Sequence, residues 1–226
     1  MIWIVLFFII LILPESAYAW GPLTHAYLSQ QIFFVPAMLP AELLTTLKLY
    51  KEYFIYGNLI PDIVIGKKYL PEDKNPHSWK TGLRLLKEAK IPEETSFAYG
   101  YLTHLAADAV LHNDIKNLTT LKHTLFELKA DRIIDRYYWI QIMTINKKVK
   151  KTSEKFFEQA AVSSNFLSLK TNTKIYKSLI FLSAFNIGEL KNTELFDSLH
   201  LKSLSAMIEL LNNRENSEII NLPPHN

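Results

Sequence analysis

Histidines and carboxylates recur at helical spacing in the middle of the chain. His104, Asp108 and His112 follow one another in steps of four residues, and His123 and Glu127 are again four residues apart. Four residues make a little over one helical turn, so the members of each set share one helix face. A short connection between the two helices would bring these faces together. Imidazole and carboxylate groups without thiolates indicate a hydrolytic zinc site rather than a Cys-rich structural one.

Further residues of the same chemical kind precede these two sets. In chain order they are Trp20, His25, Asp62 and His77. Any single histidine of the series is more readily explained as a hydrogen-bonded core residue, and the His123–Glu127 pair as a surface contact between neighbouring turns. Asp108 favours metal binding over these simpler explanations, because it lies in the apolar stretch of residues 105–111, where an unpaired carboxylate would be costly to bury. The whole series therefore favours metal binding.

The elements that must position these residues are predicted to be helices. The chain contains only six glycines, and apolar residues recur every three or four positions over long stretches, which is the helical period. The predicted helices cover residues 42–53, 79–89, 96–112, 119–143, 153–166, 171–186 and 197–212. Pro and Gly predict a loop over 57–76,. We therefore expect an all-α fold, a single-domain multi-helix bundle with the metal site between helices.

The first nineteen residues have the pattern of a signal peptide. An apolar run at residues 2–13 is followed by Ala17, Tyr18 and Ala19, a small-x-small cleavage pattern ahead of Trp20, although no Lys or Arg precedes the run,. The run is too short to span a bilayer as a helix, which takes about 20 residues. We expect cleavage between Ala19 and Trp20, export to the periplasm or the extracellular space, and no permanent transmembrane helix after processing.

Composition bounds what the rest of the chain can be. Residues 20–212 are long enough for one domain with its own core, and residues 213–226 are predicted to form a flexible tail. The chain has no Cys, so its core or metal ions must hold it together instead of disulfides. A formal charge of +3 does not mark the chain as a nucleic-acid binder, and it is compatible with weak attraction to anionic lipid. The lysines at 147–155 are interpreted first as a solvated helix end and otherwise as a patch for phosphate.

The residues singled out above resemble, in their order, the metal ligands of the zinc-dependent phospholipase C family. The likeness covers residues 20–131, and the carboxyl-terminal third is similar only in being helical. The resemblance implies a trinuclear site with three zinc ions. One ion would be bound by the amine and carbonyl of Trp20 with His25, a second by Asp62, His77 and His104, and a third by His112, His123 and Glu127. Asp108 would bridge the first two ions, and Asp62 would also act as the general base that orients the attacking water.

The implied reaction is hydrolysis of a phosphodiester, with a phospholipid at a membrane surface as the substrate. Clustered divalent ions stabilise the attacking and leaving oxygens, and a metal lowers the pKa of a bound water from 15.7 to about 7. Two departures from the family pattern limit what the resemblance implies. In the secreted bacterial lipases the histidine after the bridging Asp comes later than His112 does here, so we expect the third ion to sit differently or bind less tightly. Leu23 stands where the choline pocket has a carboxylate, so choline preference is not implied.

Two other functions stay open on the sequence alone. A nuclease or nucleotidase of the related P1 type shares the amino-terminal Trp and a similar metal set, and it would need aromatic platforms for the bases of a nucleic acid along a cationic groove. Phe97, Tyr99, Tyr101 or Trp79 would serve either use. A non-catalytic, metal-stabilised lipid-binding module is the other alternative.

Asp131, one turn after Glu127, is interpreted either as a partner of a histidine ligand or as a helix-surface charge.

Overall fold

The computed structural model of the protein describes residues 20–63, 75–115, 120–160 and 193–224. Its helices are α2 (Pro22–Gln31), α3 (Ala41–Leu49), α4 (Lys51–Ile63), α5 (Trp79–Glu88), α6 (Pro92–Asp114), α7 (Thr120–Arg132), α8 (Arg136–Thr144), α9 (Lys147–Ala160) and α11 (Glu194–Asn213). Short 3-10 helices follow at Ile32–Phe34, Pro36–Met38, Arg214–Asn216 and Glu218–Asn221. The part of the chain that the structure describes contains no strand. The predicted all-α fold is confirmed.

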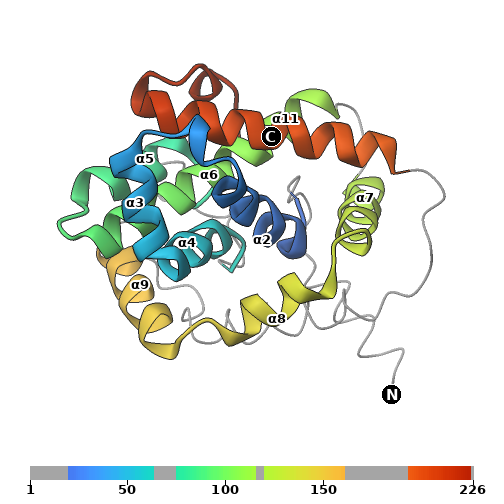
Figure 1. Cartoon of the computed structure of the whole chain (residues 1–226). Coiled ribbons are helices and arrows are strands. Elements are labelled where there is room, and N and C mark those ends of the chain that lie inside the picture. The colour runs from blue at the N-terminus through green and yellow to red at the C-terminus, as the bar shows by residue number, and fades with distance from the viewer. Residues whose placement is uncertain (1–19, 64–74, 116–119, 161–192, 225–226) are drawn as a thin grey trace.

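Helix α6 forms the centre of the fold. It packs mainly against α4, α5 and α11, and it also contacts α2, α3 and α9. In Figure 1, α11 runs above α6 and α2 lies in front of it. Every residue of α6 from Ser96 to His112 is buried. A helix enclosed on all sides has no solvated face, so its polar side chains must find partners inside the protein.

Two glycines allow α4 and α6 to cross at very short range. A Cβ atom at Gly57 would collide with the backbone carbonyl of Phe97, and one at Gly100 would collide with that of Phe54. Because each glycine faces the backbone of the other helix, the two backbones are in direct contact where they cross. This crossing fixes the end of α4 relative to the middle of α6.

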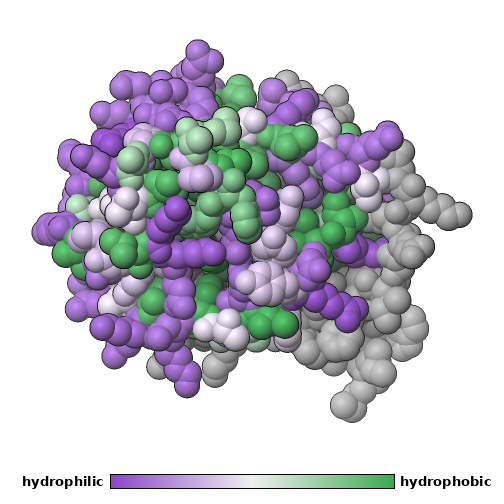
Figure 2. Space-filling view, viewed as in Figure 1, coloured by the Kyte–Doolittle hydropathy of each residue, from purple (hydrophilic) through white to green (hydrophobic). Residues whose placement is uncertain are grey.

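Apolar residues from several helices form two buried clusters along α6. One cluster contains Phe97 and Tyr101 and extends to α4 and α9. The other contains Leu102 and Leu111 and extends to α3 and α11. On the face shown in Figure 2, hydrophilic side chains are interspersed with hydrophobic ones. None of the helices described is both long enough and apolar enough to cross a membrane.

The structure corrects several predicted boundaries. Residues 57–63, expected in a loop, form the last turns of α4 although Pro61 lies inside the helix. The missing N–H of Pro61 removes one helical hydrogen bond, and the packing of α4 on α6 outweighs that loss. The helix predicted over 119–143 is divided into α7 and α8, because the Asp135 side chain accepts from the backbone N–H of Tyr137 over 2.7 Å and starts a new helix. The helix predicted over 42–53 is likewise divided between α3 and α4.

The structure also bears on the predictions for the carboxyl-terminal part of the chain. Helix α9 begins at Lys147, six residues before the predicted start at 153, and the helix predicted over 171–186 lies outside the described residues. Residues 213–224, expected in a flexible tail, pack on the domain. Ile219 is buried in the core, and the indole N–H of Trp79 donates to the carbonyl of Leu222 over 2.7 Å. Apolar residues in this segment supply the contacts, so the prediction of a flexible tail is corrected as far as residue 224.

Candidate metal centre

Five of the predicted ligand side chains lie together in the fold. They come from α2, the end of α4, the turn before α5 and the middle of α6, and they are His25, Asp62, His77, His104 and Asp108. Nε2 of His104 is 3.0 Å from Oδ2 of Asp108, and Nε2 of His25 is 3.2 Å from Oδ1 of the same carboxylate. Nε2 of His77 is 3.2 Å from Oδ1 of Asp62. Residues far apart in the sequence thus meet within ion-pair distance.

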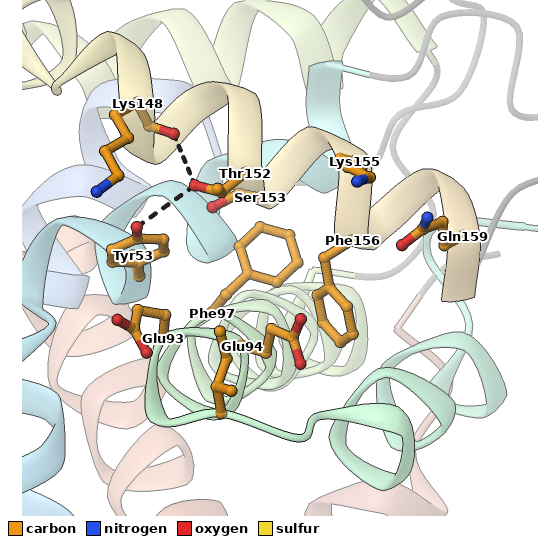
Figure 3. Close-up of a pocket in the computed structure, with 11 residues that line it drawn as sticks. Tyr53, Glu93, Glu94, Phe97, Lys148, Thr152, Ser153, Lys155, Phe156 and Gln159 are labelled. Carbon is orange, nitrogen blue, oxygen red and sulfur yellow. Dashed lines mark hydrogen bonds between the residues drawn. The ribbon is translucent and has the colours of Figure 1, made fainter.

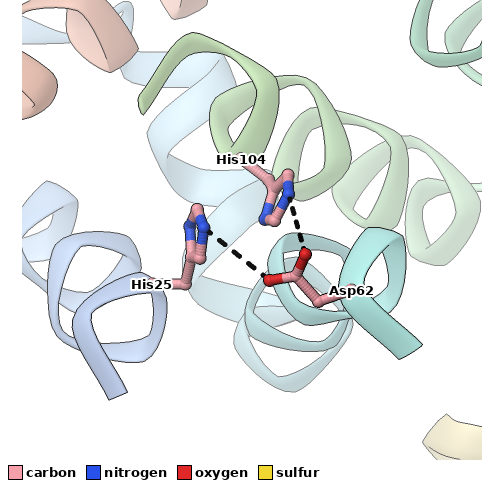
Figure 4. A group of neighbouring side chains, drawn as sticks. All are labelled: His25, Asp62 and His104. Carbon is pink, nitrogen blue, oxygen red and sulfur yellow. Dashed lines mark ion pairs between the residues drawn. The ribbon is translucent and has the colours of Figure 1, made fainter. Parts of the chain in front are cut away.

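Two overlapping sets within this cluster have the geometry of a metal site. The ligand atoms of His25, Asp62 and His104 lie within 4.8 Å of one another, as do those of His77, His104 and Asp108. Figure 4 shows the first set, in which His25 and His104 face the two oxygens of Asp62 over 3.9 Å each. His104 belongs to both sets, so the five side chains form one continuous centre. The predicted assignment of each ligand to a particular ion stays a prediction.

The hydrogen bond of His104 to α4 orients its other ring nitrogen toward the centre. Nδ1 of His104 is 2.8 Å from the backbone carbonyl of Asn58, and a carbonyl oxygen only accepts, so Nδ1 carries the proton. Nε2 is therefore the ring nitrogen that is free to bind a cation, and it lies 3.0 Å from Oδ2 of Asp108 and 3.1 Å from Nε2 of His77. Imidazole nitrogens and a carboxylate oxygen at such short range are donors that suit zinc.

Burial decides the charge of the ligands. Burial lowers the pKa of His25, and the neighbouring His104 lowers it further, while the Asp108 carboxylate opposes both effects. Burial by itself would raise the pKa of Asp108, but His104 and His25 hold that pKa well below its usual range. The lowered pKa of His25 favours the neutral imidazole and the lowered pKa of Asp108 favours the carboxylate, and these are the forms that bind a metal ion,.

Local contacts hold the remaining ligands in place. Asn58, one turn before Asp62 on α4, donates through Nδ2 to the carbonyl of Gly100 and to Oγ1 of Thr103 over 3.1 and 3.0 Å. The backbone N–H of His77 donates to Oδ1 of Asn75 over 2.9 Å. The hydroxyl of Tyr101 donates to the carbonyl of Pro76, so α6 also anchors the turn that carries His77. The role of Asn58 was not predicted, because recognising it required residues 57–63 to be a helix.

Trp20 places its backbone at the centre, as its predicted role requires. Its backbone N–H donates to Oδ1 of Asp108 over 3.1 Å. Its indole N–H donates to Oγ of Ser203 on α11 over 3.0 Å, and the ring packs against Phe126 and His200. The side chain is fully enclosed. The position fits the prediction that Trp20 binds metal through its backbone, and the binding itself stays a prediction.

The third predicted set is only partly within the described residues. His112 is buried on α6, two turns after His104. Glu127 lies half-buried on α7, and the backbone of His123 lies one turn before it on the same helix, but the His123 side chain is outside the described residues. Among the side chains that are described, no group of three ligands includes His112 or Glu127. The third zinc ion therefore stays a prediction.

Asp131 fits neither of its two sequence interpretations. It is buried, and it accepts hydrogen bonds from the start of α2 instead of from a histidine ligand: from the backbone N–H groups of Leu23 and Thr24, and from the Thr24 hydroxyl. Burial raises the pKa of Asp131 to about 6, although these hydrogen bonds oppose the rise. No local sequence signal points to this contact, because the partners are more than a hundred residues apart.

A groove of about 360 Å³ lies away from the centre, between α9 and the first turns of α6. In Figure 3, the rings of Phe97 and Phe156 lie between lysines of α9 and the carboxylates of Glu93 and Glu94. Phe97 precedes His104 by seven residues, which is about 10 Å along a helix. The carboxylates across the groove balance Lys148 and Lys155, which favours the solvated interpretation of the basic stretch over a phosphate patch.

A family model described as zinc-dependent phospholipase C matches residues 24–177, more than half of the 226 residues. The chain belongs to the zinc-dependent phospholipase C family. Neither a curated protein nor a solved structure matches the chain significantly. The matched residues of this family member include every predicted metal ligand except Trp20, and they exclude α11. Helix α11, which holds the Trp20 indole, therefore lies beyond the part of the chain that identifies the family.

Proposed function

We propose that this family member is an exported phospholipase C that hydrolyses the phosphodiester bond between the glyceride and the headgroup of a phospholipid. The observation that carries the proposal is the centre formed by His25, Asp62, His77, His104 and Asp108, whose buried imidazoles and carboxylates fit zinc. Membership of the zinc-dependent phospholipase C family supports the same reaction. Three zinc ions would be held by these five side chains, by the backbone of Trp20, and by His112, His123 and Glu127.

The two carboxylates of the centre have different surroundings, and these suit different roles. The Asp108 side chain is fully buried, whereas the Asp62 side chain is 13% exposed. Bound zinc would lower the pKa of water and stabilise the charge that grows on the phosphodiester oxygens. Asp62 lies where water can reach its carboxylate, so it can orient the attacking water and accept a proton from it. Asp108 stays ionised and holds the N–H of Trp20 and the ring of His25.

Export with cleavage after Ala19 would complete the centre. Cleavage would turn the backbone nitrogen of Trp20 into a free amine, and this nitrogen lies 3.1 Å from Asp108. An amine with an unperturbed pKa near 8 can lose its proton to a metal. An amide nitrogen has no lone pair to give at neutral pH. The proposed first zinc therefore depends on processing of the chain.

Contact with a membrane surface would be made beside the centre. Helix α8 packs against α2, which carries His25. Tyr137 and Ile140 of α8 are three residues apart and more than half exposed, so they share one outward face. Exposed aromatic and aliphatic side chains suit an interfacial contact with lipid. Leu23, at the position of the family's choline carboxylate, is buried in the core, so this position supplies no carboxylate for choline.

The reaction is tested with the purified chain beginning at Trp20, incubated with vesicles of zwitterionic and of anionic phospholipids and, in parallel, with single-stranded DNA. We expect diacylglycerol and phosphorylated headgroup from at least one lipid. Asp62→Asn should lower the rate by about 10²- to 10⁴-fold, as loss of a general base does. Asp114→Asn is the matched control, because Asp114 is a carboxylate at the end of α6 that pairs with Lys202 over 2.5 Å, outside the centre.

Each result of this assay decides between the functions considered. Lipid cleavage that is lost in Asp62→Asn and kept in Asp114→Asn supports the phospholipase C. Cleavage of DNA without cleavage of lipid would replace it with the nuclease alternative. Zinc-loaded protein that cosediments with the vesicles and cleaves neither substrate would identify a non-catalytic lipid-binding module. Metal analysis of the same samples should give close to three zinc ions per chain.

A further inference from the structure

The first turn of α2 has no cap of its own. Gly21 precedes the helix and offers no side chain, and Pro22 has no N–H,. The first backbone donors are therefore the N–H groups of Leu23 and Thr24, which a helix leaves without partners. Both donate to the Asp131 carboxylate near the end of α7, over 3.3 and 2.9 Å, and the Thr24 hydroxyl adds a third bond of 2.9 Å. A residue from a distant helix thus caps α2.

The pocket for this carboxylate is closed. Asp131 is 3% exposed, and a Cβ atom at Gly21 would lie 2.5 Å from its Cγ and from both carboxylate oxygens. Burial of a carboxylate is costly without hydrogen bonds. Here three donors and the positive end of the α2 dipole offset that cost. Gly21 leaves the space that the carboxylate fills.

The residues on either side of the capped turn belong to the metal centre. Trp20 precedes it and donates its N–H to Asp108, and His25 follows it with Nε2 at 3.2 Å from the same carboxylate. A shift of the first turn of α2 would therefore move both predicted ligands of the first zinc.

His25 depends on this turn more than His104 depends on its own helix. Nδ1 of His104 is held by a backbone carbonyl of α4. Nδ1 of His25 has no hydrogen-bond partner among the described residues, and its ring is supported by stacking on His104 at 3.9 Å between centroids. A metal-binding histidine is usually oriented by a partner on its second nitrogen. For His25 the backbone of α2 must supply that orientation.

We propose that Asp131 is a positioning residue of the metal centre, which sets the backbone of Trp20 and the ring of His25 by capping the first turn of α2. The inference rests on the proposed function in one respect, that the centre binds zinc. Glu127 lies one turn before Asp131 on α7. The helix that carries a predicted ligand of the third ion therefore also holds the ligands of the first.

The test measures zinc affinity by competition with a chromogenic chelator, using the chain that begins at Trp20. Asp131→Asn keeps the shape of the side chain but loses its charge and one acceptor. It should lower the affinity of the protein for one zinc ion on the order of 10- to 100-fold, as loss of a supporting contact does. Asp135→Asn is the matched control. Asp135 caps α8 through Tyr137 and is exposed, so this variant changes the charge of a helix cap away from the centre and should keep the zinc affinity of the wild type.

Combination with His25→Ala distinguishes positioning from general stabilisation. If Asp131 acts through His25 and Trp20, the double variant should lose less zinc affinity than the sum of the two single losses, because part of the effect of Asp131 passes through the ring that His25→Ala removes. Cobalt(II) in place of zinc should show an altered absorption band in Asp131→Asn as well as in His25→Ala, because both variants disturb the surroundings of the same ion. If Asp131→Asn does not fold, Gly21→Ala provides the second variant, since it keeps the carboxylate and displaces it.

The possible results separate the inference from the proposed function. Equal zinc affinity in Asp131→Asn and the wild type, with only a lower unfolding temperature, would reduce Asp131 to a structural helix cap and leave the phospholipase C intact. Additive losses of affinity in the double variant would also overturn the positioning role. A wild type that binds no zinc would overturn both the proposed function and this inference.

Discussion

Residues 96–103 and 104–112, the first and second halves of the buried part of α6, differ in the polar side chains they enclose. The first half contributes Phe97 and Tyr101 to an apolar cluster with α4 and α9. The second half buries His104, Asp108 and His112, each no more than 5% exposed. Burial of apolar surface stabilises a fold by about 25 cal/mol per Å², whereas burial of charged groups costs free energy unless they are paired or bind metal. Apolar side chains of both halves therefore stabilise the fold, and in the second half they also enclose the His and Asp side chains of the candidate metal centre.

The largest expected effect is the loss of activity in Asp108→Ala, in the second half. The change removes the carboxylate that contacts Trp20, His25 and His104. Loss of several kcal/mol of transition-state stabilisation corresponds to a decrease of about 10³-fold or more in kcat/KM. Kinetics and zinc analysis check it together. A variant with full zinc content and near-normal turnover would show that the second half is not a metal centre.

In the first half, Phe97→Ala should affect stability instead of metal binding. Phe97 is fully buried, with its ring 5.9 Å from that of Phe156, and removal of a buried Phe side chain costs about 3–5 kcal/mol. Denaturant unfolding should show this loss while the zinc content of the folded fraction stays the same. Loss of zinc from chains that are still folded would abolish the distinction between the two halves.

Acid should lower the stability of the folded protein through His200, which lies beside the centre. Burial lowers the pKa of His200, which packs against Trp20, to about 4. Above about pH 6.5, the unperturbed pKa of His, the His200 ring is neutral in the folded and in the unfolded protein. As the pH falls below that value, the unfolded chain binds a proton at His200 before the folded protein does. Stability is therefore complete above about pH 6.5 and is lost as pH falls towards 4, by about 3 kcal/mol at most. Unfolding of metal-free protein at stepped pH should show a smaller loss in His200→Gln, and identical curves would contradict the prediction.

An extra Met before Trp20 should have a smaller effect, confined to the second half. The chain would fold, but an amide would replace the free amine beside Asp108. The protein should therefore bind one zinc ion less tightly and keep its affinity for the others. We expect a decrease in turnover on the order of 10- to 100-fold, the range seen when one supporting group of a metal site is lost. Trp20→Ala with a free amino terminus should keep much of the metal, since both donor atoms belong to the backbone. Equal zinc and turnover in the extended and free forms would leave Trp20 as a core aromatic only.

The smallest expected effect concerns the surface beside the centre. Tyr137→Ser combined with Ile140→Ser removes two exposed side chains of α8. Binding to vesicles, measured by sedimentation, should fall several-fold, because each buried CH₂ group contributes about 0.8 kcal/mol to membrane attachment. Hydrolysis of a soluble phosphodiester should not change. If both substrates were affected equally, α8 would act on the centre itself instead of on the membrane.

The sequence by itself determined the fold class and the chemistry of the centre. Apolar residues at helical spacing predicted an all-α protein, because that period reflects which helix faces are buried. The steps of four from His104 to Asp108 and from His123 to Glu127 placed ligand types on shared faces. His25, Asp62 and His77 were predicted from their chemical type and order, and the fold brings them to His104 and Asp108.

Only the tertiary structure decided how those residues are held. Helix α4 continues through Pro61 because glycines let it pack directly on α6, a gain that local propensity does not contain. The segment after Asn213 packs on the domain through Ile219. Asp131 caps a helix more than a hundred residues away in the chain. Spacing along a chain shows which side chains share a helix face, but contacts between helices depend on packing of the whole fold, so they could not be predicted from local patterns.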